Sequence, residues 1–276
     1  MGENRHCPIQ TKNILAYISK EVTLCEGSDM KIKERFFKVG EEWNVIHLPS
    51  KPNGFAIFII GDINHFVQGN TSSWQQRPDQ AKFIEELKNA GYTVVYSNLY
   101  GRNWGSDDAC RLLKRLCDEV MKKEILNKKV HLIAEGMGAL VAAKLVPKFE
   151  ASFRSVVMIN PCLSLKEYYN REKKNKLFYK RFLKELKKAY CLEEAELEKT
   201  ISDMDIYNYQ VMPVPSRIFY CMHATPYSLQ SHVRPYEQMC NQQSNRVEVS
   251  IFLKSKPFEE LAKHTIEFLK KHEQLL

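Results

Sequence analysis

Hydrophobic residues along this chain form short apolar runs that alternate with stretches of helical spacing. The clearest run, at residues 54–61, reads GFAIFIIG and is bounded by glycines, as expected for a strand buried on both faces. Helical spacing follows at residues 79–90, where Ala81, Ile84 and Leu87 recur on one face. Further strands are predicted at 92–96, 130–134, 155–159, 217–222 and 246–253, and further helices at 107–126, 136–146, 228–241 and 257–275.

This alternation predicts an α/β fold with a mostly parallel central sheet covered by helices on both faces, because parallel strands need helical crossovers. Residues 35–39 and 43–49 flank a Gly-Glu-Glu turn and are expected to form an antiparallel hairpin. Segment 163–209 has no strand pattern and reads as amphipathic helices. We therefore divide the chain into an N-terminal arm (1–34), a core (35–162 and 210–276) and a helical cap insertion (163–209).

Residues 130–142, VHLIAEGMGALVA, predict a buried strand that turns sharply into a helix. Together with the order of elements, this stretch resembles the nucleophile elbow of the α/β-hydrolase fold superfamily, the serine esterases and lipases. Residues 59–74 (IIGDINHFVQGNTSSW) are similar to the family's oxyanion loop, and residues 96–109 (YSNLYGRNWGSDDA) to the loop before the elbow helix. The resemblance covers the chain from about residue 35 to its end.

The resemblance also implies where a nucleophile, an acid and a base would stand, and none of these residue types is found there. Gly136 takes the place of the elbow serine. No Asp or Glu occurs from Ser216 through Val233, where the acid is expected, and the loop LKSKP at 253–257 contains no histidine. Since a serine hydrolase needs all three groups within hydrogen-bond reach, the sequence predicts a protein that has lost hydrolytic activity.

The strand ends around the elbow predict a ligand-binding crevice. Its expected residues are Gly61, Asp62, Ile63, His65, Glu135, Gly136, Met137, Cys162 and His223. If catalysis persists, the candidate residues are Glu135 as a base for water, Cys162 as a relocated nucleophile and His223. The simpler interpretations are a salt-bridged Glu135, an inert buried Cys162 and structural histidines at positions 65 and 223.

Two cofactor readings of the same residues are weaker. His65 and His223 could form a metal pair, but no third ligand stands at a recognisable spacing, so no metal is predicted. Gly136 and Gly138 resemble part of a dinucleotide fingerprint, but Val141 stands at its third glycine position and Asn160, at the end of the next strand, is no ribose-binding acid. We expect no cofactor.

Composition predicts a cellular compartment and a basic stretch of surface. The 276 residues include eight scattered cysteines without a metal-binding spacing, and no signal peptide or transmembrane-length apolar run is recognised, which favours the cytoplasm. The net charge of +8 is concentrated between Lys166 and Lys188, where ten Lys or Arg face three Glu. This stretch is either a surface for an anionic partner, nucleic acid or membrane lipid, or a solvated helix face. Its aromatic residues are expected to pack down onto the sheet: Tyr168, Tyr169, Phe178, Tyr179 and Phe182.

The sequence thus favours a pseudoenzyme that binds a small apolar or amphipathic ligand, or a protein partner, between cap and sheet. The alternatives are an ester or thioester hydrolase with relocated catalytic residues, and an interaction module for an anionic partner. A Gly136→Ser variant is expected to fold and to remain inactive.

Overall fold

The computed structural model describes residues 33–222, 224–243, 247–253 and 258–273. Three predicted features therefore lie outside the described residues: residues 1–32 of the N-terminal arm, His223, and positions 254–257 of the loop in which a catalytic base is expected. Within the part that is described, no helix is long and apolar enough to cross a membrane.

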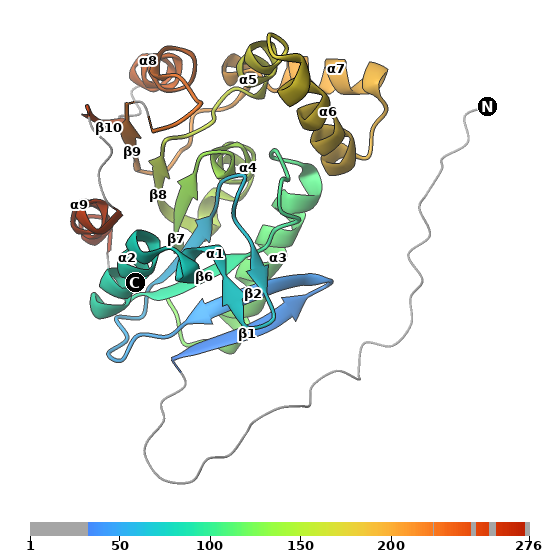
Figure 1. Ribbon diagram of the computed structural model, residues 1–276. Coiled ribbons are helices and arrows are strands. Elements are labelled where there is room, and N and C mark those ends of the chain that lie inside the picture. The colour runs from blue at the N-terminus through green and yellow to red at the C-terminus, as the bar shows by residue number, and fades with distance from the viewer. Residues whose placement is uncertain (1–32, 223, 244–246, 254–257, 274–276) are drawn as a thin grey trace. The chain divides into compact units, whose positions relative to one another are not determined.

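An eight-stranded sheet forms the centre of the fold, in the order β1-β2-β6-β3-β7-β8-β9-β10 (Figure 1). In this sheet β2 runs antiparallel to both of its neighbours, β1 and β6, and every other pair is parallel. The strands are β1 Glu34–Val39, β2 Glu42–His47, β3 Ala56–Ile60, β6 Thr93–Ser97, β7 Val130–Glu135, β8 Phe153–Ile159, β9 Ser216–Cys221 and β10 Val247–Phe252. This confirms the predicted mostly parallel sheet and its N-terminal hairpin.

Helices cover both faces of the sheet. One hydrophobic cluster joins the sheet to α3 Asp107–Lys123, α4 Gly138–Leu145 and α8 Arg234–Gln242, and another joins it to α2 Pro78–Asn89 and α9 Phe258–Lys270. The start of α3 shows why these boundaries form. The Ser106 side chain accepts a hydrogen bond from the Ala109 N–H, and Asp107 and Asp108 lie in the first turn, where the helix dipole favours negative charge.

Several short elements were not anticipated. The predicted helix at 228–241 is a π-helical turn, Leu229–Val233, followed by α8. The loop after β3 contains a small hairpin, β4 Val67–Gln68 with β5 Thr71–Ser72, and the one-turn helix α1 Ser73–Gln76. The 3-10 helices Pro147–Ser152 and Ile206–Asn208 were also not anticipated.

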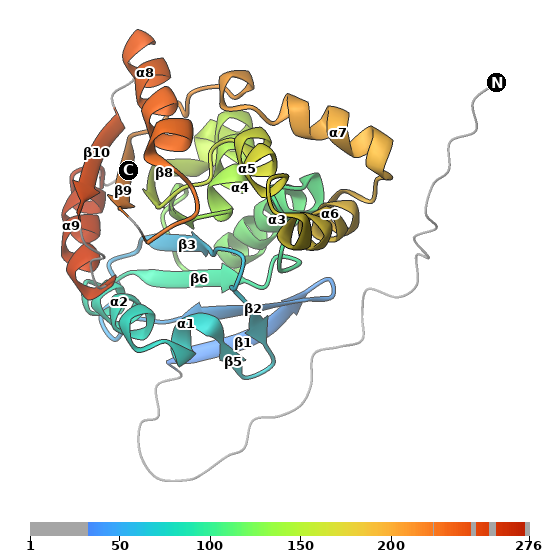
Figure 2. The ribbon, with the colours of Figure 1, turned by 45° about the horizontal axis from the view of Figure 1, so that its top comes forward.

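Three helices lie between β8 and β9 in the chain: α5 Leu165–Glu172, α6 Lys176–Tyr190 and α7 Glu194–Asp203. Figures 1 and 2 show them grouped beside the start of α4. A third hydrophobic cluster explains this position, because it joins Phe182 and Leu186 of α6 to Met137 and Leu140 at the elbow. The α6 side chains therefore cover the sheet edge at which the candidate site lies.

The expected burial of the cap aromatics is only partly correct. Tyr168, Tyr169 and Phe182 are buried, whereas Tyr179 is half-buried. The prediction for Phe178 is wrong, since 58% of this residue is exposed. Phe178 lies at the start of α6, beyond the part of the helix that packs on the core.

Candidate functional site

The elbow is a sharp corner built on two glycines. β7 ends at Glu135, Gly136 follows with φ +50°, and α4 begins at Gly138. Left-handed φ is rare for residues with a Cβ, which explains the glycine at 136. At Gly138 a Cβ would lie 2.5 Å from the Ile60 carbonyl oxygen of β3, so the close approach of the chains explains the second glycine.

Asp62 fills the space that a side chain at position 136 would need. A Cβ on Gly136 would lie 2.5 Å from Asp62 Oδ2 and closer still to Cγ and Oδ1. Oδ1 accepts a hydrogen bond from the Met137 backbone N–H (2.8 Å) and another from the Tyr227 hydroxyl (3.0 Å). In an esterase elbow, the N–H of the residue after the nucleophile stabilises the oxyanion of the reaction. Here that N–H is bound to the chain's own carboxyl group.

Two carboxyl groups lie close to this corner and affect each other. Burial raises the pKa of Asp62, against the lowering effect of the Met137 and Ile63 N–H groups and of the Tyr227 hydroxyl. Burial and the Asp62 charge raise the pKa of Glu135 to about 8. Gln80 Nε2 is 3.5 Å from Glu135 Oε2. At neutral pH, Glu135 therefore holds a proton for most of the time.

Cys162 lies directly behind the elbow and is completely buried. Its backbone N–H donates to the Gly136 carbonyl (2.9 Å), and its thiol lies 3.9 Å from the Ser164 carbonyl oxygen. Burial and the Asp62 carboxyl raise the pKa of the thiol. Because the thiolate is the reactive form, this environment disfavours nucleophilic chemistry at Cys162.

His65 is bound on both sides of its ring. Nε2 lies 2.9 Å from the Ser97 carbonyl oxygen and Nδ1 3.2 Å from Ser73 Oγ. Burial lowers the pKa of His65 to about 4, so the ring is neutral at pH 7. Gly61 makes room for this ring, since a Cβ there would overlap it. Among the described residues, no group of three or more His, Cys, Asp or Glu side chains could hold a metal ion.

Tyr227 occupies the loop after β9, where the resemblance predicts a carboxylate. Besides its bond to Asp62, its ring lies 5.2 Å from that of Tyr168 in the cap and 5.6 Å from that of His232. Burial raises the pKa of Tyr227 well above its usual value, so the hydroxyl stays protonated and can donate. Tyr227 thus links the loop after β9 to Asp62 and to the cap.

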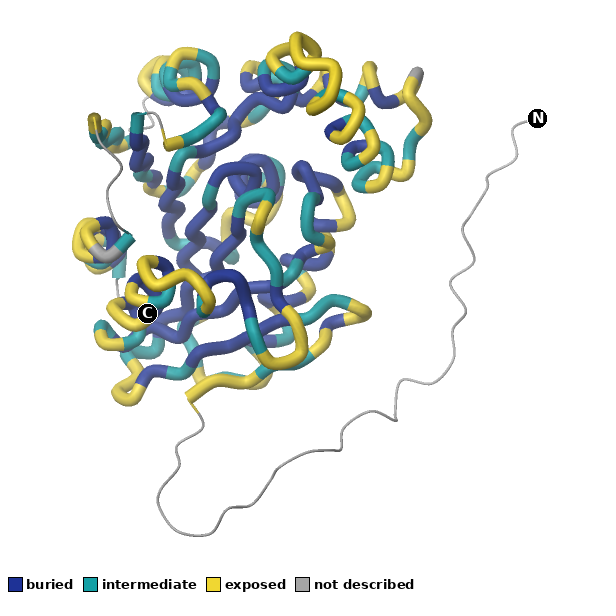
Figure 3. The backbone as a smooth tube through the Cα atoms, in the orientation of Figure 1, coloured by how far each residue is buried: buried dark blue, intermediate teal, exposed yellow. Residues whose placement is uncertain are grey.

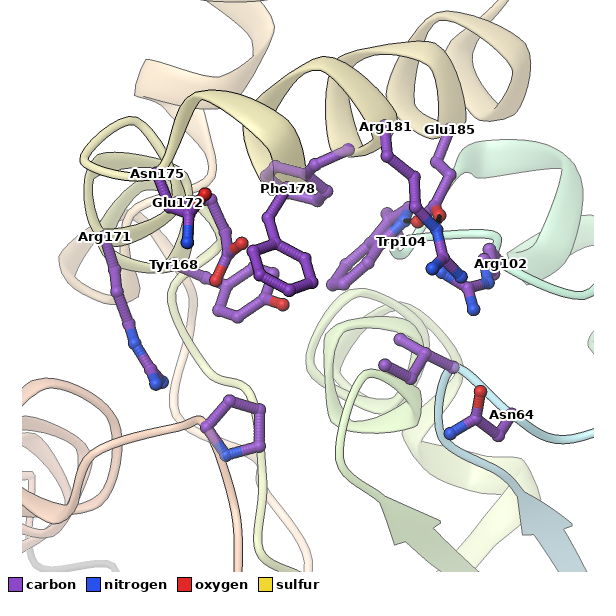
Figure 4. Close-up of a pocket in the computed structure, with 13 residues that line it drawn as sticks. Asn64, Arg102, Trp104, Tyr168, Arg171, Glu172, Asn175, Phe178, Arg181 and Glu185 are labelled. Atoms are coloured by element: carbon purple, nitrogen blue, oxygen red, sulfur yellow. Dashed lines mark hydrogen bonds and ion pairs between the residues drawn. The ribbon is translucent and has the colours of Figure 1, made fainter.

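A cavity of about 550 Å³ lies between the cap and these loops (Figure 4). Figure 4 shows Arg171, Phe178 and Arg181 reaching from α5 and α6 toward the loops below. Of the predicted crevice residues that the structure describes, Ile63 belongs to the wall of this cavity. The lining residues are Ile63, Asn64, Arg102, Trp104, Tyr168, Arg171, Glu172, Asn175, Phe178, Arg181, Phe182, Glu185 and Pro226.

The wall of the cavity combines an aromatic floor with charged groups. Trp104, held at φ +46°, stacks on Tyr168 with ring centroids 5.2 Å apart and donates through Nε1 to Glu185 (3.1 Å). Glu185 also pairs with Arg102 and with Arg181. Arg171, in contrast, has no ion-pair partner among the described residues. The cavity therefore offers aromatic surface, a cluster in which two arginines share the carboxylate of Glu185, and a further guanidinium, that of Arg171, that can bind an anion.

Sequence reasoning missed most of this wall. The loop at 96–109 predicts the fold, but its pattern assigns no role to Arg102 or Trp104. Arg171 was counted only as part of the cap's charge. An arginine and a tryptophan two residues apart in a loop beside the elbow were the available signal, because such side chains recur at binding sites.

No protein-family model matches this sequence, and no curated protein matches it significantly. Solved structures do match. An esterase from Pyrococcus furiosus is 15% identical with a TM-score of 0.59, and the match covers 88% of this chain and 91% of that one. For Est1E from Butyrivibrio proteoclasticus the values are 11%, 0.56, 87% and 98%. The acylaminoacyl peptidase of Pyrococcus horikoshii gives 14% and 0.60, over 88% of this chain and 42% of that one. At these identities, the matches bear on the fold alone.

Proposed function

We propose that this chain, which has the α/β-hydrolase fold, is a pseudoenzyme that binds a small amphipathic ligand in the cavity between its cap and the sheet edge. The observation that carries the proposal is the position of Asp62. Its carboxyl group fills the space of a nucleophile at residue 136 and accepts the Met137 N–H.

This arrangement opposes the reaction of the fold's esterases in two ways. Acyl transfer needs a nucleophile at the elbow, and Gly136 supplies none. It also needs free N–H donors where negative charge develops on the substrate oxygen. The Asp62 carboxyl oxygen accepts the Met137 N–H and so occupies one such donor.

The cavity wall suggests the chemical class of the ligand. Trp104, Tyr168 and Phe178 offer apolar surface for an aromatic or acyl body. Arg171 can pair with an anionic head group, because none of the described carboxylates pairs with it. A volume of about 550 Å³ lies within the range of small-molecule sites.

Two assays test the proposal. The full chain should neither hydrolyse p-nitrophenyl acetate or butyrate nor be labelled by a fluorophosphonate. It should bind 8-anilinonaphthalene-1-sulfonate, an anionic amphiphile, in a saturable way that lauric acid reverses. Arg171→Gln should weaken this binding about tenfold, the loss expected for one charge-assisted hydrogen bond, whereas Lys122→Gln, far from the cavity on α3, should not. Equal affinities of all three proteins would refute the site.

The alternative is a hydrolase with relocated groups, and the pKa of Glu135 near 8 favours it, because a general base works best with a pKa near the working pH. Glu135 or Cys162 would then act with the N–H groups near Asp62 and Met137. Ester or thioester turnover by the wild type that Glu135→Gln or Cys162→Ala abolishes would replace our proposal with this one.

We also propose that the protein is located in the cytoplasm. The described cysteines are free thiols: Cys110, Cys117, Cys162, Cys191, Cys221 and Cys240. Free thiols are usual in a reducing compartment, which supports the cytoplasm.

A further inference from the structure

The turn between α5 and α6 carries large apolar side chains at the surface. Leu177 is 82% exposed and Phe178 58% exposed, side by side in the first turn of α6. Lys173, Lys174 and Lys176 immediately precede them and are also exposed. Single exposed apolar residues are common, but an adjacent pair flanked by lysines is not explained by packing.

The outer face of α6 continues this pattern with a row of lysines. Lys180, Lys184 and Lys188 follow Leu177 at spacings of three and four residues, which places all four side chains on one face of the helix. All three lysines are exposed, and Figure 3 colours many residues along the outer turns of the cap as exposed. Neither these lysines nor Lys174 and Lys176 have an ion-pair partner among the described residues. We call these six residues, 174, 176, 177, 180, 184 and 188, the cap face.

Helix α3 shows that the cap face is unusual for this chain. α3 is also rich in basic residues, but its outer face is neutralised at helical spacing, since Lys114 pairs with Asp118 and Arg115 with Glu119. On α6 the corresponding carboxylate, Glu185, points into the cavity and pairs with Arg102 and Arg181. The five lysines of the cap face are thus left as uncompensated positive charge.

We propose that the cap face docks on an anionic lipid bilayer, with Leu177 inserted among the acyl chains and the lysines on the lipid head groups. Apolar residues beside a basic helix face are the pattern by which amphipathic helices lie in a membrane interface. The charge alone would also suit a nucleic acid. Leu177 decides for lipid, because an aliphatic side chain cannot stack on a base, whereas burial in acyl chains stabilises it.

This docking is independent of the proposed function but fits it spatially. Phe178, the residue after Leu177 in the chain, is 58% exposed and belongs to the wall of the cavity. Docking would therefore bring the rim of the cavity to the lipid surface, from which an amphipathic molecule could enter.

Vesicle flotation of the full chain tests the proposal. The protein should float with phosphatidylcholine vesicles containing about a third phosphatidylglycerol at 0.1 M salt, and stay unbound with phosphatidylcholine alone or at 0.5 M salt. Lys180→Gln/Lys184→Gln/Lys188→Gln should lower the partition coefficient about a hundredfold, since each lysine contributes about fivefold. Leu177→Ser should lower it about tenfold through lost apolar burial.

Matched controls carry the same changes on another surface. Lys122→Gln/Lys128→Gln/Lys148→Gln removes three exposed or loop lysines away from the cap, and Ile125→Ser removes one fully exposed aliphatic residue. Both controls should bind vesicles like the wild type. Equal losses in variants and controls would overturn the proposal in favour of general charge attraction. Absence of vesicle binding would overturn it outright, and so would tight binding to an RNA or DNA oligonucleotide that depends on the lysines but not on Leu177.

Discussion

Replacing Gly136 with alanine should reveal whether Asp62 really occupies the nucleophile's place. The new Cβ would meet the Asp62 carboxyl group at 2.5 Å or less, and the residue would have to keep φ +50°. Either the carboxyl group leaves its position, or the corner between β7 and α4 opens. The structure favours the first outcome, since Asp62 lies on a loop whereas Gly138 is held against β3.

The cost has two separable parts. Left-handed backbone at an alanine costs about 1–2 kcal/mol relative to glycine. Displacing Asp62 costs its hydrogen bonds from the Met137 N–H and the Tyr227 hydroxyl, of which the net loss is about 2–3 kcal/mol after the carboxylate is rehydrated. Gly136→Ala should therefore lower the free energy of unfolding by about 3–5 kcal/mol, a large share of the 5–15 kcal/mol typical of a domain.

A double-mutant cycle separates the two parts. In an Asp62→Ala background the carboxyl group is absent, so Gly136→Ala should cost only the backbone part, about 1–2 kcal/mol. Asp62→Asn keeps the size and the acceptor oxygen, so in that background the cost should stay near that in the wild type. Urea unfolding at constant slope m measures each value. Equal costs of Gly136→Ala in all three backgrounds would show that Asp62 does not fill this space.

Two further predictions concern buried titratable groups. Because the folded pKa of Glu135 is raised to about 8, the folded chain holds a proton that the unfolded chain releases above its ordinary pKa, and stability is lost as the pH rises toward 8. Glu135→Gln should therefore unfold like the wild type at pH 4 to 5 and be more stable by a few kcal/mol at pH 8, as measured by urea unfolding; parallel pH profiles would contradict the assignment. His232 accepts two backbone N–H groups at the start of the cap, at 3.1 and 3.2 Å, and burial lowers its pKa to about 4. His232→Ala should cost about 2–4 kcal/mol because it leaves both donors unpaired, whereas His232→Asn, which retains an acceptor, should cost clearly less; equal losses would mean that packing and not hydrogen bonding is removed.

The fold could be predicted because its signals are local. The apolar run at 56–60 and the glycines at the elbow determine backbone behaviour within a few residues, and alternation with helices leaves few possible sheet topologies. Element ends were less certain: α3 ends at Lys123, short of the predicted residue 126, and α4 begins at Gly138 instead of 136. The ends of helices depend on helix-capping residues and on tertiary packing.

The site was harder to predict because it depends on contacts between distant segments. Asp62 and Tyr227 are 165 positions apart and meet because β3 lies beside β7 and the loop after β9 folds back over both. The sequence pattern placed Asp62 in the crevice but gave no reason to expect its carboxyl group above Gly136. The expectation that a Gly136→Ser variant folds and remains inactive also takes no account of this contact, since the serine Cβ would meet the same carboxyl group.

A nucleophile restored at residue 136 would also lack a catalytic base and acid among the described residues. His65, on the loop after β3, and His232, in the π-helical turn before α8, are both used structurally. The first bridges Ser97 and Ser73, and the second holds the backbone at the start of the cap. Both rings are kept neutral by burial, and neither has a carboxylate to orient it among the bonds that the structure describes. A triad works because each member is free to exchange a proton with the next. Here the corresponding polar groups are hydrogen-bonded within the fold, which agrees with our proposal that the cavity under the cap, and not the elbow, binds the ligand.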